Sequence, residues 1–187
     1  ILLSQENPFY APAYPNEKNN QFTQPSFLDT NLVVQGAWSR LNNLPKSLIG
    51  LNTYYDSLTN RIFICGGADQ NSALNDTCWW YNIAGGTYQQ AAFLPQGRWF
   101  GKLVKVKNNL YLVGSIGSSF SLPDGIIYKY SLLQNLWSVA DTMPAPFVHE
   151  AAVCVLYDSL IVTIGGSING YSGAKNYVRI FNPALST

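Results

Sequence analysis

Few residues in this chain have side chains that could do chemistry. The sequence holds one histidine, His149, and Glu150 follows it directly. An imidazole beside a carboxylate is a common acid–base pair in catalysis. Neighbouring residues on a strand point to opposite faces, however, so we interpret His149 as a structural residue. If the protein is an enzyme, the residues to test are Arg98, His149 and Glu150, near the starts of predicted strands.

The three cysteines, Cys65, Cys78 and Cys154, lack the close spacing of a metal-binding motif. We interpret them as small buried hydrophobic residues on strands. A disulfide between Cys65 and Cys78 stays open, because the first ends one predicted strand and the second lies on the next. Without a cluster of ligand residues in the sequence, we predict no metal and no cofactor.

Three loops remain as candidate binding regions, at residues 68–74, 118–124 and 167–175. They are rich in Ser, Asn, Gly and Tyr, which combine adaptable hydrogen bonding with aromatic anchors. The candidate binding residues are Asp69, Asn71, Phe120, Asp124, Asn169 and Tyr171. This composition leads us to expect a protein or glycan partner.

A repeat of about 50 residues positions these loops. Its markers are the aromatic residues Trp38, Tyr88 and Trp137, the aromatic residues Tyr81, Tyr130 and Phe181, and the glycines Gly66, Gly67, Gly114, Gly165 and Gly166. Corresponding markers lie 48 to 51 residues apart. Apolar-proline pairs such as Leu94-Pro95 and Met143-Pro144 follow in the same order. Several markers in one order at one period indicate a repeated structural unit.

The segments inside each repeat are rich in β-branched and aromatic residues, and turn residues interrupt them at short intervals. This pattern predicts an all-β protein. About four strands per repeat of this length are typical of a propeller blade. We predict an extended Pro/Asn/Gln-rich N-terminal arm at residues 1–35 and propeller blades over 36–187, with repeats at about 46–95, 96–144 and 145–187.

The repeat resembles the kelch family of β-propellers over residues 36–182. Residues 74–82 look like the family's third strand, the glycine pairs like the end of its second, and Trp137 with Met143-Pro144 like its fourth. The departures are Ser115 for a second glycine, Tyr88 for a tryptophan, and Leu48 and Phe147 where Arg98 stands three positions after a proline.

The resemblance implies that the glycines allow close approach of neighbouring blades and that the recurring aromatic residues pack between blades. It also implies a function: a noncatalytic recognition or assembly module that binds a protein or glycan through its loops. The alternative is a carbohydrate-active kelch-type enzyme, an isomerase or oxidase with its site in the channel. Copper oxidases built on kelch propellers use two histidines, and the single His149 argues against that chemistry.

Counted in order, the strands predict a lone fourth strand at 36–42, two full blades, and three strands of a third blade at about 147–182. Propellers close with about four to eight blades. We therefore expect a longer chain or a second copy to supply the remaining blades. The missing strand should carry an aromatic residue about 7 positions after Phe181, by the spacing from Tyr130 to Trp137.

The composition excludes some partners. Charged residues make up 11% of the chain and the net charge is +1, so there is no basic surface for nucleic acid. No apolar run is long enough for a membrane-spanning helix. The Asn/Gln-rich composition and the apolar Ile1-Leu2-Leu3 favour a secreted, periplasmic or cell-surface location, although the odd cysteine count is more typical of a reducing compartment.

Overall fold

The computed structural model describes residues 40–117, 122–169 and 172–185. The chain divides into two units, residues 1–40 and 41–187, and the fold given below is that of the second. The described strands are β1 (Asn52–Asp56), β2 (Arg61–Cys65), β3 (Cys78–Asn82), β4 (Thr87–Ala91), β5 (Lys102–Val106), β6 (Asn109–Val113), β7 (Ile126–Ser131), β8 (Leu136–Thr142), β9 (Ala152–Leu156), β10 (Leu160–Ile164) and β11 (Val178–Phe181). No helix occurs in the described ranges.

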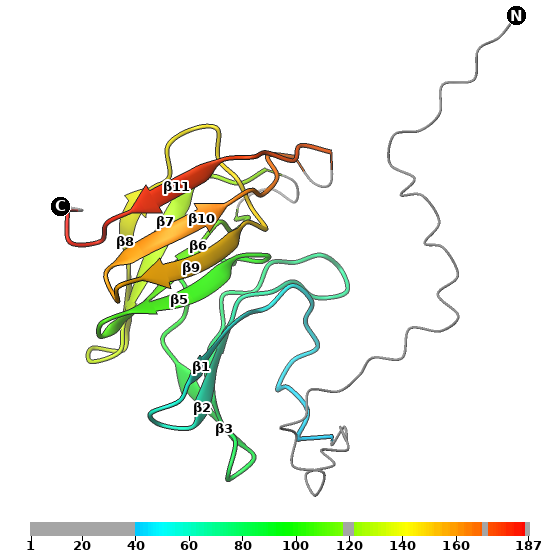
Figure 1. Ribbon diagram of the computed structural model, residues 1–187. Coiled ribbons are helices and arrows are strands. Elements are labelled where there is room, and N and C mark those ends of the chain that lie inside the picture. The colour runs from blue at the N-terminus through cyan, green and yellow to red at the C-terminus, as the bar shows by residue number, and fades with distance from the viewer. Residues whose placement is uncertain (1–39, 118–121, 170–171, 186–187) are drawn as a thin grey trace, which may run out of the picture. The chain divides into compact units, whose positions relative to one another are not determined.

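The strands form three antiparallel sheets in which each strand pairs with the next one along the chain (Figure 1). Sheet 1 holds β1 to β4, sheet 2 holds β5 to β8, and sheet 3 holds β9 to β11. Tight turns that contain a residue in the left-handed conformation connect the two strands of a hairpin. Examples are Asn60 (φ 51°) between β1 and β2 and Lys107 (φ 53°) between β5 and β6. The predicted all-β class is confirmed.

The three sheets share one backbone pattern at their entry points. Gly50, Phe100 and Glu150, each 50 residues apart, all have a left-handed conformation, with φ of 62°, 57° and 54°. The residue before each of them forms a bridge to the segment after the second strand of its sheet, as Ile49 does to Ala68. The sequence period therefore corresponds to a repeated sheet with a repeated entry.

In the third repeat, the residue equivalent to Arg98 lies one position later than the spacing from the proline predicts. A Cβ atom at Gly66 would overlap the backbone carbonyl of Arg98, and the Cβ position of Gly114 lies 3.4 Å from the carbonyl oxygen of Val148. Val148 is thus the counterpart of Arg98, and Phe147, placed there by counting from the proline, lies instead against Gly125. The reason is an additional residue between Met143 and the strand entry.

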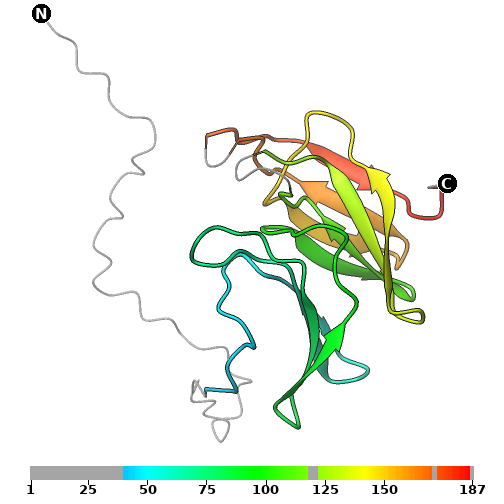
Figure 2. The ribbon, with the colours of Figure 1, turned by 180° about the vertical axis from the view of Figure 1, so that it is seen from behind.

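Neighbouring sheets pack face to face, and their first strands contact each other, β1 with β5 and β5 with β9 (Figures 1 and 2). The core between sheets 1 and 2 is formed by Phe63, Cys65, Cys78, Trp80, Ala91, Leu94, Leu103, Leu110, Leu112, Tyr128, Tyr130 and Trp137. The core between sheets 2 and 3 is formed by Val106, Tyr111, Val113, Ile127, Met143, Val148, Ala151 and Ile161. Alternation along each strand of sheet 2 divides its side chains between these two cores.

The glycine pairs lie where the sheets approach closely. Gly67 has φ 88°, Gly166 has φ 99°, and the Gly67 N–H donates a hydrogen bond of 2.7 Å to the carbonyl oxygen of Arg98 in the next repeat. Ser115 holds the corresponding place in sheet 2 without a positive φ, so a side chain is accepted there. The second position is therefore left-handed in the first and third repeats only, whereas the first position is left-handed in all three, with φ of 71°, 64° and 70° at Gly66, Gly114 and Gly165.

Candidate functional site

The predicted loops of all three repeats follow the second strands of their sheets, next to the strand entries. In each repeat, the residue before the left-handed entry residue forms an isolated β-bridge with a residue that follows the second strand. That residue forms a second bridge with the far end of the loop, as in Trp99 to Ile116 and Ile116 to Pro123. His149, Ser167 and Ala174 form the same pair of bridges in the third repeat. The candidate loops are thus equivalent parts of three equivalent sheets.

Asp69 stabilises its own loop. Its carboxylate Oδ1 accepts hydrogen bonds from the backbone N–H groups of Asn71 and Ala73, each at 2.9 Å. This is the Asx-type arrangement that orders short polar turns. Asn71 is exposed at the tip of this loop, as are Gln70, Ser72 and Ala73.

Asp124 forms an ion pair with Arg98, whose side chain is fully buried. The guanidinium Nη1 lies 2.7 Å from the carboxylate, and Nη2 donates to the Tyr128 hydroxyl at 3.0 Å and to Gln96 Oε1 at 3.1 Å. The same guanidinium lies over the Tyr128 ring, 4.8 Å from its centroid, and Gly117 packs against it. Arg98 and Asp124 therefore anchor the base of the second loop. Sequence alone separates them by 26 positions and gives no sign that they pair.

The third loop is held by hydrogen bonds between backbone groups and serine hydroxyls. The Asn169 N–H donates to Ser167 Oγ at 3.3 Å, and the Asn169 carbonyl oxygen accepts from the backbone and hydroxyl of Ser172, each at 3.2 Å. Phe120 and Tyr171, the two aromatic candidates, lie outside the described residues.

His149 and Glu150 lie on the same side of the backbone, which corrects the expectation that they point to opposite faces. Glu150 has φ 54°, and this left-handed turn interrupts the strand alternation, so its Oε2 lies 3.5 Å from His149 Nδ1. His149 is 2% exposed, and neither ring nitrogen has a hydrogen-bond partner among the described residues. Burial lowers the pKa of His149, and the Glu150 carboxylate partly offsets this effect. Burial therefore favours the neutral form of the imidazole.

The described part of the chain contains no cluster of three or more His, Cys, Asp or Glu side chains that could hold a metal ion. It also contains no helix long and apolar enough to cross a membrane.

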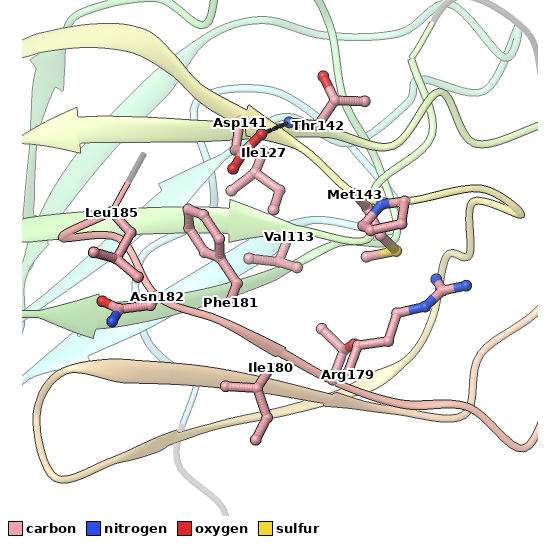
Figure 3. Close-up of a pocket in the computed structure, with 12 residues that line it drawn as sticks. Val113, Ile127, Asp141, Thr142, Met143, Arg179, Ile180, Phe181, Asn182 and Leu185 are labelled. Atoms are coloured by element: carbon pink, nitrogen blue, oxygen red, sulfur yellow. Dashed lines mark hydrogen bonds between the residues drawn. The ribbon is translucent and has the colours of Figure 1, made fainter. Parts of the chain in front are cut away.

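The structure adds a feature that the sequence does not indicate: a cavity of about 460 Å³ between the outer strands of sheets 2 and 3 (Figure 3). It is lined by Val113, Ile127, Asp141, Thr142, Met143, Pro144, Thr163, Arg179, Ile180, Phe181, Asn182 and Leu185. Figure 3 shows Phe181 beside Ile127 and Val113 on one side and Arg179 beside Met143 on the other. The cavity thus has an apolar wall and a polar rim.

The corresponding space between sheets 1 and 2 is filled by Trp137. Its ring lies 5.1 Å from Tyr130 and 6.1 Å from Phe63, and its indole N–H donates to the Ala92 carbonyl oxygen at 3.1 Å. Trp137 belongs to β8, the fourth strand of sheet 2. Sheet 3 has three strands in the described ranges, so no described residue takes the place of Trp137 there.

No protein-family model matches the chain, and no curated protein is similar enough to count as a match.

Proposed function

We propose that this chain is a noncatalytic assembly and recognition module of the kelch-propeller type, and that sheet 3 is its docking surface. The occupant is an extended strand that carries an aromatic residue and brings a further sheet of the same repeat with it. The observation that carries the proposal is the edge strand β11 beside a cavity of about 460 Å³.

The edge strand supports strand addition. In sheets 1 and 2 the third strand pairs on its outer side with a fourth, whereas β11 pairs with β10 alone among the described strands. A strand edge of this kind presents backbone N–H and C=O groups that an incoming strand can pair with. An antiparallel fourth strand would make sheet 3 equivalent to its neighbours.

The cavity supports an aromatic occupant. Val113, Ile127 and Phe181 line it, at the repeat positions of Cys65, Cys78 and Tyr130 in the core between sheets 1 and 2. In that core the fourth strand contributes an indole. The segment Gly36–Asn42 repeats the Trp-Ser pair of β8 as Trp38-Ser39, which makes it a suitable source from a second copy of the chain.

The far face of sheet 3 supports a further sheet. Its exposed apolar side chains are Leu156, Ile164, Val178 and Ile180. Val178 and Ile180 are 67% and 64% exposed, on the strand face opposite Phe181. On sheet 2 the equivalent face is buried against sheet 3. Adjacent apolar side chains left exposed in this way are typical of an interaction surface.

The contacts of Asn42 with sheet 1 support the choice of Gly36–Asn42 as the source of the strand. Asn42 Nδ2 donates to the Gly86 carbonyl oxygen at 2.6 Å, and the Tyr88 hydroxyl donates to the Asn42 carbonyl oxygen at 3.2 Å. At the same repeat position, directly after β4, the Ala92 N–H donates to Asn135 Oδ1 at 2.9 Å and the Ala92 carbonyl oxygen accepts from the Trp137 indole N–H at 3.1 Å. Asn42 therefore contacts sheet 1 at the position where Ala92 contacts sheet 2.

The test uses the full chain and a synthetic peptide of residues Gly36–Asn42. We expect the peptide to bind the Trp38→Ala chain, and the same peptide with alanine in place of Trp38 to bind far more weakly. Analytical ultracentrifugation should show that the wild-type chain self-associates and that Trp38→Ala weakens this, by about 3 to 5 kcal/mol for a core aromatic truncation. A monomeric chain that does not bind the peptide would contradict the proposal.

The enzyme alternative has weaker support. The Arg98 guanidinium is engaged by Asp124, Gln96 and Tyr128, and His149 is buried away from the cavity between sheets 2 and 3. A recognition role through the exposed loop tips, with Asn71 among the contact residues, is compatible with docking at sheet 3. A secreted, periplasmic or cell-surface location remains part of the proposal.

A further inference from the structure

Cys65 and Cys78 face each other across neighbouring strands. Cys65 ends β2, Cys78 begins β3, and the two are direct partners in the antiparallel register. The Gly66 N–H donates to the Thr77 carbonyl oxygen at 3.1 Å, so the hydrogen-bonded pair lies one position further on and the cysteines form a non-hydrogen-bonded pair. The Cα atoms in such pairs lie about 4.5 Å apart, within the range of about 4.4 to 6.8 Å that a disulfide spans.

The surroundings favour contact between these two thiols over contact with other thiols. Both side chains are 0% exposed and belong to the core between sheets 1 and 2. Burial raises the pKa of the Cys65 thiol, and a hydrogen bond with the Cys78 thiol raises it further. Cys154 is exposed on β9 in sheet 3, far from this core. Cys65 and Cys78 are free cysteines in the structure.

We propose that Cys65 and Cys78 are a disulfide site, which closes when the chain folds or locally opens in an oxidising thiol buffer. A thiolate from one cysteine attacks glutathione disulfide and releases one glutathione. The second thiolate then attacks the mixed disulfide and releases another. The cysteines lose two protons and two electrons, the glutathione disulfide takes up the electrons, and one S–S bond forms in the protein.

The bond would close the β2–β3 connection at its base. Residues 66–77 lie between the cysteines and include Asp69 and the exposed Asn71 of the first candidate loop. Because a crosslink restricts the unfolded chain, the oxidised protein should unfold at a higher temperature, by roughly 5 to 10 °C for a loop of this size. The crosslink would also prevent local unfolding motions that separate the end of β2 from the start of β3.

The test refolds the full chain from denaturant in a glutathione redox buffer. The Cys154→Ser variant removes the exposed thiol and with it disulfides between chains. We expect peptide mapping by mass spectrometry to find Cys65 joined to Cys78, with the raised unfolding temperature lost on reduction. The matched control, Cys154→Ser with Cys78→Ala, should show no such change in either measurement.

Two outcomes would overturn the proposal. One is that both thiols stay reduced after refolding and after prolonged incubation of the folded protein with glutathione disulfide. The other is that Cys65 or Cys78 accumulates as a mixed disulfide with glutathione while its neighbour stays reduced, since that would show that the pair cannot close. The peptide-binding test of sheet 3 is independent of both.

Discussion

Between sheets 1 and 2 the ring centroids of Phe63 and Tyr130 lie 4.8 Å apart, whereas the corresponding rings of Tyr111 and Phe181, between sheets 2 and 3, lie 6.2 Å apart beside a cavity. The repeats provide similar aromatic residues in both places. The difference is Trp137, which the fourth strand of sheet 2 adds to the first core. In sheet 2 the fourth strand therefore supplies the residue that fills the core with its neighbour.

The largest effect should come from emptying the filled core. Trp137→Ala removes a buried indole and its hydrogen bond to Ala92, and we expect it to lower the free energy of unfolding by about 3 to 5 kcal/mol. Urea unfolding followed by circular dichroism measures this. Val139→Ala on the same strand is the control, because Val139 is 59% exposed and should cost far less. Equal losses would mean that the indole is not what completes this core.

A smaller loss is expected from the buried ion pair that anchors the second loop. Arg98→Met removes the charged partner of Asp124 and the donor to the Tyr128 hydroxyl. The loss should be about 2 to 3 kcal/mol, because Asp124 is partly exposed and keeps its hydrogen bond from the Ile126 N–H. A double-mutant cycle with Asp124→Asn measures the coupling. If Arg98 acts only through its apolar contacts, the two losses will add without a coupling energy.

Truncating Phe181 should cost less than truncating Trp137, since its ring already borders open space. We expect Phe181→Ala to lower the free energy of unfolding by about 1 to 2 kcal/mol, below the range for fully buried aromatic residues. The same variant should bind the Gly36–Asn42 peptide more weakly, which calorimetry can measure. Leu133→Ala, at an exposed turn position, is the control for peptide binding. Unchanged peptide affinity in Phe181→Ala would show that the docked peptide does not contact Phe181.

The smallest effect concerns pH. The pKa of His149 is lowered in the folded state because the side chain is buried, so the unfolded chain binds more protons as the pH falls through the ordinary range of histidine near about 6.5. The stability contributed by neutral His149 is present above this range and is lost as the pH falls. His149→Gln should flatten the dependence of the unfolding free energy on pH between about 5 and 7. A variant with the wild-type slope would show that another group is responsible.

The strands and the repeat could be read from the sequence because their causes are local. Alternating apolar and aromatic residues select strands, turn residues end them, and the period of about 50 residues indicates a repeated unit. The loops could be located for the same reason. The single extra residue before Val148 could not, since a proline count assumes a constant spacing that the backbone does not keep.

The tertiary structure alone decided which of these residues meet. Arg98 pairs with Asp124 across 26 positions, and His149 shares a side with Glu150 because one left-handed residue breaks the strand alternation. The cavity beside Phe181 likewise arises from what two sheets leave between them. Local propensities determine where strands begin and end, but contacts between distant segments depend on how the sheets pack, and a single sequence records that packing only indirectly.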